Sequence, residues 1–134
     1  MPVLVDTNVL LDIATEDPLW FDWSAAQLSK AANQDGLAIN PIVYAELSVH
    51  YETLEALEAG LSGYAFARLA LPWDAAFVAG KAFRRYRRRA GAKRSPLPDF
   101  YIGAHAAVSG LPLLTRDARR YRDYFPKLKI ITPA

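Results

Sequence analysis

The sequence predicts an α/β fold in which a mostly parallel sheet of about five strands is sandwiched between helices. Short apolar runs without polar alternation, such as VLVD at 3–6 and LPLLT at 111–115, are typical of strands buried on both faces. Stretches with helical spacing of apolar residues lie between these runs, which indicates βαβ units. A chain of 134 residues, 52% of them hydrophobic, is expected to form a single domain over 1–134.

The first half of the chain is expected to contain two strands and four helices. Pro18 suits the first turn of a helix, and Asn40 followed by Pro41 is a typical helix start. Leucines in TLEALEAGL recur at helical spacing. The expected strands are 3–6 and 36–40, and the expected helices are 8–14, 18–34, 41–51 and 53–61.

The second half of the chain is expected to contain three strands and three helices. Asp74 can cap a long helix, and Gly110 is a typical residue at a helix end. The expected strands are one within 64–71, one at 111–115 and one at 127–133, and the expected helices are 74–90, 99–110 and 116–125, with a loop at 91–98.

Composition excludes several classes of protein and site. The chain has no cysteine, so disulfides, thiolate metal sites and cysteine nucleophiles are excluded. No apolar stretch approaches the roughly 20 residues of a membrane span, and no signal-peptide pattern begins the sequence. We therefore expect a cytoplasmic protein without membrane contact.

The net charge of +2 hides a strong asymmetry between the two halves of the chain. Residues 1–60 hold ten acids and one base, whereas residues 61–134 hold four acids and fifteen bases. A basic half indicates a polyanionic partner, although an arginine-rich, solvated helix face would give the same composition.

Four acids are expected at the carboxyl edge of the sheet, where open α/β sheets bind their ligands. Asp6 and Asp117 follow two of the expected strands, Asp99 starts the helix before one of them, and Glu46 lies in the helix after the second strand. Each acid also has a structural interpretation. The three aspartates could be helix caps or first-turn residues, and Glu46 could be a surface residue.

Converging carboxylates repel one another, which raises their pKa values unless a cation joins them. Oxygen ligands suit Mg²⁺ or Mn²⁺, and such ions activate water and bind phosphate oxygens during hydrolysis. Four acids beside an arginine-rich surface therefore indicate a metal-dependent nuclease.

Four sequence segments together carry a resemblance to a known family. They are LVDTNVLLD (4–12), NPIVYAEL (40–47), PDFYIGAHAAVSGLPLLTRD (98–117) and KIITP (129–133). In these segments and in this order, the chain resembles PIN-domain ribonucleases, and specifically the VapC toxins of VapBC toxin–antitoxin pairs. The resemblance extends over nearly the whole chain.

This resemblance implies an endoribonuclease that depends on Mg²⁺ or Mn²⁺. It implies that Asp6, Glu46, Asp99 and Asp117 form the catalytic, metal-binding cluster, and that Asn8 and Thr115 support it through hydrogen bonds. It further implies a homodimer that acts on RNA and is neutralised by a cognate antitoxin. His105 departs from the small residue usual in such toxins, and we expect a packing or interface role for it.

Two arginine clusters are the expected contacts for the RNA backbone. The run KAFRRYRRRAGAKR (81–94) carries eight bases, with Phe83 and Tyr86 expected to anchor the helix. The second cluster borders Asp117 and consists of Arg116, Arg119, Arg120 and Arg122. The candidate RNA-binding residues are Arg84, Arg85, Arg88, Arg116 and Arg119. A solvated helix end or a contact with acidic antitoxin residues is the alternative.

Two further functions remain as alternatives. A strand that ends in D-x-N is also found in haloacid-dehalogenase phosphatases, but these need a second aspartate where Asn8 stands. The other alternative is an inactive PIN module that only binds RNA or protein. His50, four residues after Glu46, is expected to be exposed or in an interface, since two histidines and no cysteine make a zinc site improbable.

Overall fold

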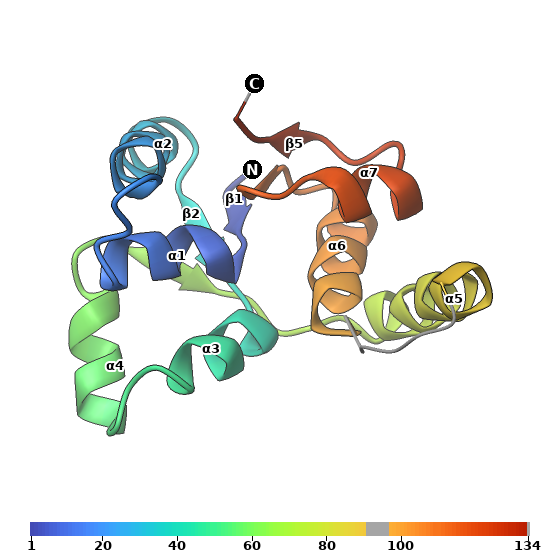
Figure 1. Cartoon of the computed structure of the whole chain (residues 1–134), viewed down its shortest axis with the longest axis horizontal. Helices are drawn as coiled ribbons and strands as arrows, with labels where there is room; N and C mark the ends of the chain where they lie inside the picture. The colour runs from blue at the N-terminus through green and yellow to red at the C-terminus, as the bar shows by residue number, and fades with distance from the viewer. Residues whose placement is uncertain (91–96, 134) are drawn as a thin grey trace.

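The computed structural model describes residues 1–90 and 97–133, and within them it contains one five-stranded, fully parallel sheet. Figure 1 shows the chain around this sheet, whose strand order is β3-β2-β1-β4-β5. The strands are β1 (Val3–Val5), β2 (Leu37–Ile39), β3 (Phe66–Arg68), β4 (Leu113–Leu114) and β5 (Ile130–Ile131). The predicted α/β class and strand number are confirmed.

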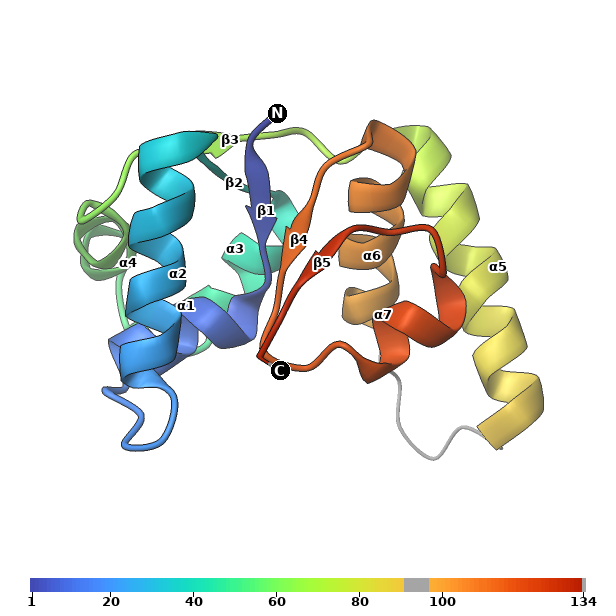
Figure 2. The same cartoon turned by 90° about the horizontal axis from the view of Figure 1, so that it is seen from above.

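Seven helices connect and cover the strands among the described residues. They are α1 (Thr7–Ala14), α2 (Phe21–Gln34), α3 (Pro41–Ser48), α4 (Leu54–Leu61), α5 (Trp73–Ala90), α6 (Leu97–Ser109) and α7 (Arg119–Tyr124). Figure 2 shows α1, α2 and α4 on one side of the strands and α5, α6 and α7 on the other. None of the helices in this part of the chain is both long and apolar enough to cross a membrane.

Local hydrogen bonds explain where two helix boundaries differ from the prediction. Helix α2 begins at Phe21 and not near residue 18, because Asp17 Oδ1 accepts hydrogen bonds from the amides of Leu19 and Trp20 and holds a turn there. Helix α3 ends at Ser48, because the following amides bond to carbonyl groups only three residues back.

Two acids that were expected at or just before helix starts, Asp74 as a cap and Asp99 as the first residue, lie within the first turns. Asp74 and Asp99 belong to the first turns of α5 and α6, which begin at Trp73 and Leu97. A loop was expected at 91–98. Residues 91–96 lie outside the described residues, and residues 97 and 98 belong to α6.

The sheet core is apolar at every position of β1, β2 and β4, whose residues are fully or almost fully buried. These strands therefore read as continuous apolar runs, as expected for a sheet with helices on both faces. Phe83 and Tyr86 of α5 stack at 6.4 Å between ring centroids and contact Phe100 of α6. The prediction that they anchor this helix is confirmed.

A buried hydrogen bond ties α3 to α6. Asn40 caps α3, since its Oδ1 accepts from the Val43 amide at 3.0 Å, and its Nδ2 lies 3.0 Å from Nδ1 of His105. His105 is 2% exposed, and burial lowers its pKa, which keeps the ring neutral and able to accept this bond. His105 is therefore a packing residue, as predicted.

An ion pair between the buried Asp12 and the partly exposed Arg116 joins α1 to the segment after β4. Asp12 is 2% exposed and accepts two hydrogen bonds from the Arg116 guanidinium, each 3.0 Å long. Ser24 of α2 donates a third bond to the same carboxylate at 2.7 Å, and the guanidinium also lies over the ring of Trp20. This pair fixes the chain that leaves β4 against the first two helices.

Replacing Arg116 with alanine should destabilise the fold by about 3 kcal/mol, because it leaves the buried Asp12 carboxylate without its counter-charge. Chemical denaturation measures this loss. Arg119→Ala is the matched control, since Arg119 is exposed and makes no ion pair within the described residues. Equal stability of the two variants would contradict a structural role for the Asp12–Arg116 pair.

Candidate active site

The site lies at the carboxyl ends of the strands, beside β1, which pairs with β2 on one side and with β4 on the other. Such a switch in strand order opens a crevice at the sheet edge. A cavity of about 380 Å³ lies there, and all four predicted acids line it: Asp6, Glu46, Asp99 and Asp117. The four acids therefore lie together at the point where the strand order predicts a crevice. Their roles in catalysis stay a prediction.

Asp6 is the most buried acid of the cavity, at 4% exposure. It stands at the N-cap position of α1, but its side chain makes no capping hydrogen bond. Its Oδ2 accepts instead from the Thr115 hydroxyl at 2.8 Å, the Tyr121 hydroxyl at 2.9 Å and Nδ2 of Asn8 at 3.3 Å. Asp6 therefore occupies the cap position of α1 with its backbone, while its side chain bonds at the cavity.

Asn8 and Thr115 form the supporting layer beneath Asp6. Besides its bond to Asp6, Asn8 Nδ2 lies 3.3 Å from the Thr115 hydroxyl, and its Oδ1 accepts from the Arg116 amide at 3.2 Å. These bonds link the start of α1 to the end of β4. The hydrogen bonds expected from Asn8 and Thr115 are present.

Glu46 reaches the cavity from α3. Its Oε1 accepts a hydrogen bond of 2.6 Å from the Thr7 hydroxyl at the start of α1. The side chain is half-buried at the edge of the apolar face that includes Val43 and Leu47. A fully exposed surface role for Glu46 is excluded by this placement.

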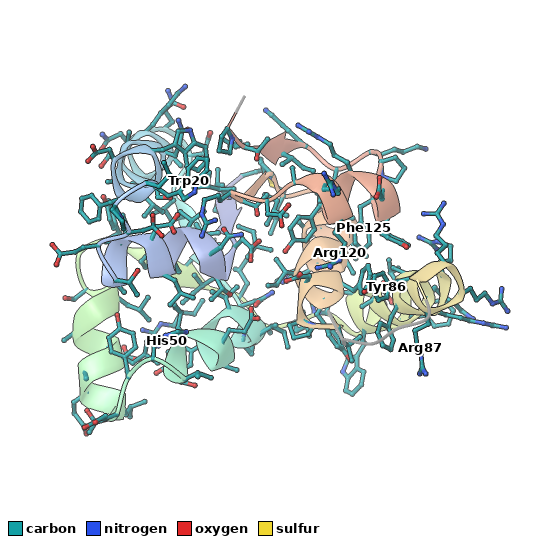
Figure 3. All side chains as sticks on the ribbon, in the orientation of Figure 1. Trp20, His50, Tyr86, Arg87, Arg120 and Phe125 are labelled. Carbon is teal, nitrogen blue, oxygen red and sulfur yellow. The ribbon has the colours of Figure 1, made fainter. Side chains whose placement is uncertain are left out.

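Asp99 and Asp117 lie on the side of the cavity formed by α6 and the segment after β4. Asp99 Oδ2 pairs with Nη1 of Arg120, and the Arg120 guanidinium also lies over the ring of Tyr86 (Figure 3). Asp117 is exposed and makes no side-chain hydrogen bond within the described residues. Arg120 is thus the cation closest to the acids among these residues.

Burial and mutual repulsion disfavour ionisation of three of the acids. Burial, followed by the charge of Asp99, raises the pKa of Asp6 from 3.8 to about 7. Burial also raises the pKa of Glu46, and the charge of Asp99 adds to this. The pKa of Asp99 is raised by burial and lowered in part by Arg120. The cavity therefore holds excess negative potential near neutral pH.

The acids share a cavity without forming a closed ligand cage. In the described part of the chain, no three carboxylate or imidazole groups lie close enough together to hold one metal ion. The donor set nevertheless consists of carboxylate, hydroxyl and amide oxygens, which is the chemistry that Mg²⁺ and Mn²⁺ prefer. The residues present fit such an ion by chemistry and charge.

Several residues of the cavity were not predicted as site residues from the sequence. Thr7 and Tyr121 line it, together with His50, which is exposed as expected. Arg120 also lines it, and it belongs to the arginine cluster that was expected to border Asp117. Figure 3 shows His50 near α3 and α4 and Arg120 near α6. Spacing could have indicated His50, since it lies one helical turn beyond Glu46, but no sequence pattern singles out Tyr121.

The arginines predicted to bind RNA differ in how free their side chains are. Arg84, Arg88 and Arg119 are exposed. Arg85 lies over the ring of Tyr124 and donates to its carbonyl at 3.3 Å. Arg116 is paired with Asp12, as described above. An RNA contact remains a prediction for each of them.

Comparisons with known proteins agree with this geometry. A model of the PIN domain matches residues 3–125, and a comparison with curated proteins gave no match. Among solved structures, a chain of VapBC2 from Rickettsia felis bound to promoter DNA is 20% identical, with a TM-score of 0.72 and 98% of both chains covered.

Two further solved structures have the same fold. DNA-bound VapBC from Salmonella typhimurium is 23% identical with a TM-score of 0.68, and a toxin–antitoxin complex from Klebsiella pneumoniae is 24% identical with a TM-score of 0.67, each with 98% of both chains covered. At these identities the matches establish a common fold. The family predicted from the motifs is confirmed: the chain belongs to the PIN domain family.

Proposed function

We propose that this protein is a metal-dependent endoribonuclease and the toxin of a type II toxin–antitoxin pair. The observation that carries the proposal is the cavity in which Asp6, Glu46, Asp99 and Asp117 meet at the switch point of the sheet. Three of these acids have raised pKa values, so the cavity favours a bound cation over the free carboxylates.

Asp6 and Asp99 are the proposed principal ligands of Mg²⁺ or Mn²⁺, with Glu46 and Asp117 completing or supporting the site. A bound ion of this kind supplies a water of lowered pKa and charge compensation at the phosphate. The protein's own part is to hold the carboxylates in place. Thr115 and Asn8 support Asp6, and Thr7 supports Glu46.

Arg120 is the proposed phosphate contact next to these acids. Its guanidinium lies in the cavity, where its pairing with Asp99 offsets part of the negative charge. A cation bound by Asp99 would weaken this pairing, and the guanidinium would then be available to a phosphate oxygen of the substrate. Exposed arginines on α5 and after β4 extend the positive surface beyond the cavity.

The proposed partners are RNA as substrate, a cognate antitoxin and a second copy of the chain. The solved structures with this fold include VapBC and other toxin–antitoxin complexes, which supports a small neutralising protein as partner. The asymmetric charge of the chain supports a polyanionic substrate, since fifteen of sixteen bases lie after residue 60.

Asp6→Asn and Asp99→Asn should each reduce cleavage of RNA in Mg²⁺ or Mn²⁺ by more than about 100-fold, because each removes a proposed metal ligand. Cleavage of total RNA, with and without chelator, measures this. Asp123→Asn is the control, as this acid is exposed on α7 outside the cavity.

Full activity of either site variant would contradict the proposed ligands, and RNA binding without cleavage by the wild type would favour a binding-only module. Hydrolysis of small phosphate esters without RNA cleavage would favour a phosphatase.

Asp6→Asn should also raise the melting temperature of the metal-free protein at pH 8. In the folded protein the pKa of Asp6 is raised from 3.8 to about 7. The unfolded chain therefore loses this proton first as the pH rises, and the free energy of unfolding falls between about pH 4 and about pH 7. Above about pH 7 the whole loss is present. The gain from the substitution should therefore shrink as the pH falls from about 7 to about 4. Thermal unfolding in chelator measures it, and a lower melting temperature of the variant at pH 8 would contradict the electrostatic cost of Asp6.

Replacing Arg84 and Arg88 together with alanine should weaken RNA binding and flatten its salt dependence. The slope of log affinity against log salt should fall by roughly 1.4, because each lost contact with a single strand removes about 0.7. Lys127 and Lys129 provide the control pair. Both precede β5 and so lie toward the amino ends of the strands, whereas the cavity lies at the carboxyl ends. An unchanged slope in the arginine variant would place these two residues outside the RNA interface.

A further inference from the structure

Tyr121 is the one buried hydroxyl that α7 brings to the candidate site. Its side chain is 2% exposed, and its OH donates a hydrogen bond of 2.9 Å to Asp6 Oδ2, 115 residues away in sequence. Burial and the nearby charge of Asp6 raise its pKa well above the ordinary value for tyrosine, so the hydroxyl keeps its proton and acts as donor.

The depth of Tyr121 in the protein depends on close packing between α6 and α7. A Cβ added at Gly103 of α6 would lie 2.6 Å from a ring carbon of Phe125 and 3.0 Å from a ring carbon of Tyr121. The distance to Phe125 is shorter than a real Cβ atom adopts and the distance to Tyr121 is unusually tight, so glycine at this position lets both aromatic rings lie directly on α6. The Tyr121 ring is thereby held where its hydroxyl reaches Asp6.

The three donors to Asp6 all use the same carboxylate oxygen. Tyr121, Thr115 and Asn8 bond to Oδ2, and among the described residues no donor contacts Oδ1. No side-chain oxygen in this part of the chain is both buried and without a partner, so Oδ1 keeps some exposed surface, and Asp6 lines the cavity. The carboxylate is therefore held through one oxygen, and the other oxygen has no donor among the described residues and is left for a ligand.

We infer that Tyr121 is a positioning residue that orients the Asp6 carboxylate for a divalent cation. The inference rests on the proposed function, because it assumes an ion at these acids. Tyr121 touches the proposed ligand and not the substrate, so its effect passes through Asp6. Partners that fix metal ligands in this way typically contribute 10–100-fold to metal affinity.

The test compares Mn²⁺ affinity of the wild-type protein with that of Tyr121→Phe and Tyr124→Phe. Tyr124 is the matched control because it lies on the same helix, is also buried, and makes no hydroxyl hydrogen bond in the described part of the chain. Free Mn²⁺ is measured by electron paramagnetic resonance without RNA, and thermal unfolding is followed in parallel. We expect Tyr121→Phe to bind Mn²⁺ about tenfold more weakly, while Tyr124→Phe binds it like the wild type.

Three outcomes would overturn the inference in distinguishable ways. Equal Mn²⁺ affinity of the wild type and Tyr121→Phe would remove the role of Tyr121 while leaving the proposed metal site intact. The same loss in Tyr124→Phe would assign the effect to packing of α7 and not to the hydroxyl. Absence of Mn²⁺ binding by the wild type would overturn the proposed function, and the inference with it.

Discussion

The buried carboxylate of Asp6 is the group on which the arrangement of the site depends. It lies directly after β1, the middle strand of the sheet, and its pKa is raised to about 7 by burial and by the neighbouring Asp99. Three hydrogen bonds reach one of its oxygens, and those from Thr115 and Tyr121 lower the pKa in part. They come from segments that are separate in sequence, namely α1, the end of β4 and α7. Holding one acid thus requires the correct docking of all three.

The other acids are positioned by the contacts between helices. Glu46 and Asp99 belong to α3 and α6, and the buried bond between Asn40 and His105 joins these two helices. The ion pair of Asp12 with Arg116 anchors the segment that carries Asp117. These contacts between helices bring four carboxyl groups into one cavity. The carboxylates repel one another, and the stability of the rest of the fold has to compensate for this repulsion.

Sequence patterns predicted the elements well and their boundaries less well. Continuous apolar runs identified the buried strands, and helical spacing identified the helices between them. The start of α2 differs from the prediction because the Asp17 side chain accepts two amide hydrogen bonds, and the end of α3 differs because turns of three residues follow Ser48. Both effects involve only a few residues, and hydrophobic periodicity is read over longer windows. The two short strands β4 and β5 occupy only the middle of the apolar segments predicted for them.

The sequence by itself determined the fold class, the family and the four acids at the carboxyl edge of the sheet. These features depend on residue types, their order along the chain and the rule that parallel strands end at one edge. Only the tertiary structure decided that Tyr121 and Thr7 join the acids, that Arg120 pairs with Asp99, and that Arg116 pairs with the buried Asp12. Such contacts join residues up to 115 positions apart. The bond from Tyr121 to Asp6 depends on the close approach of aromatic rings of α7 and the following residue to Gly103 of α6, which no local pattern encodes.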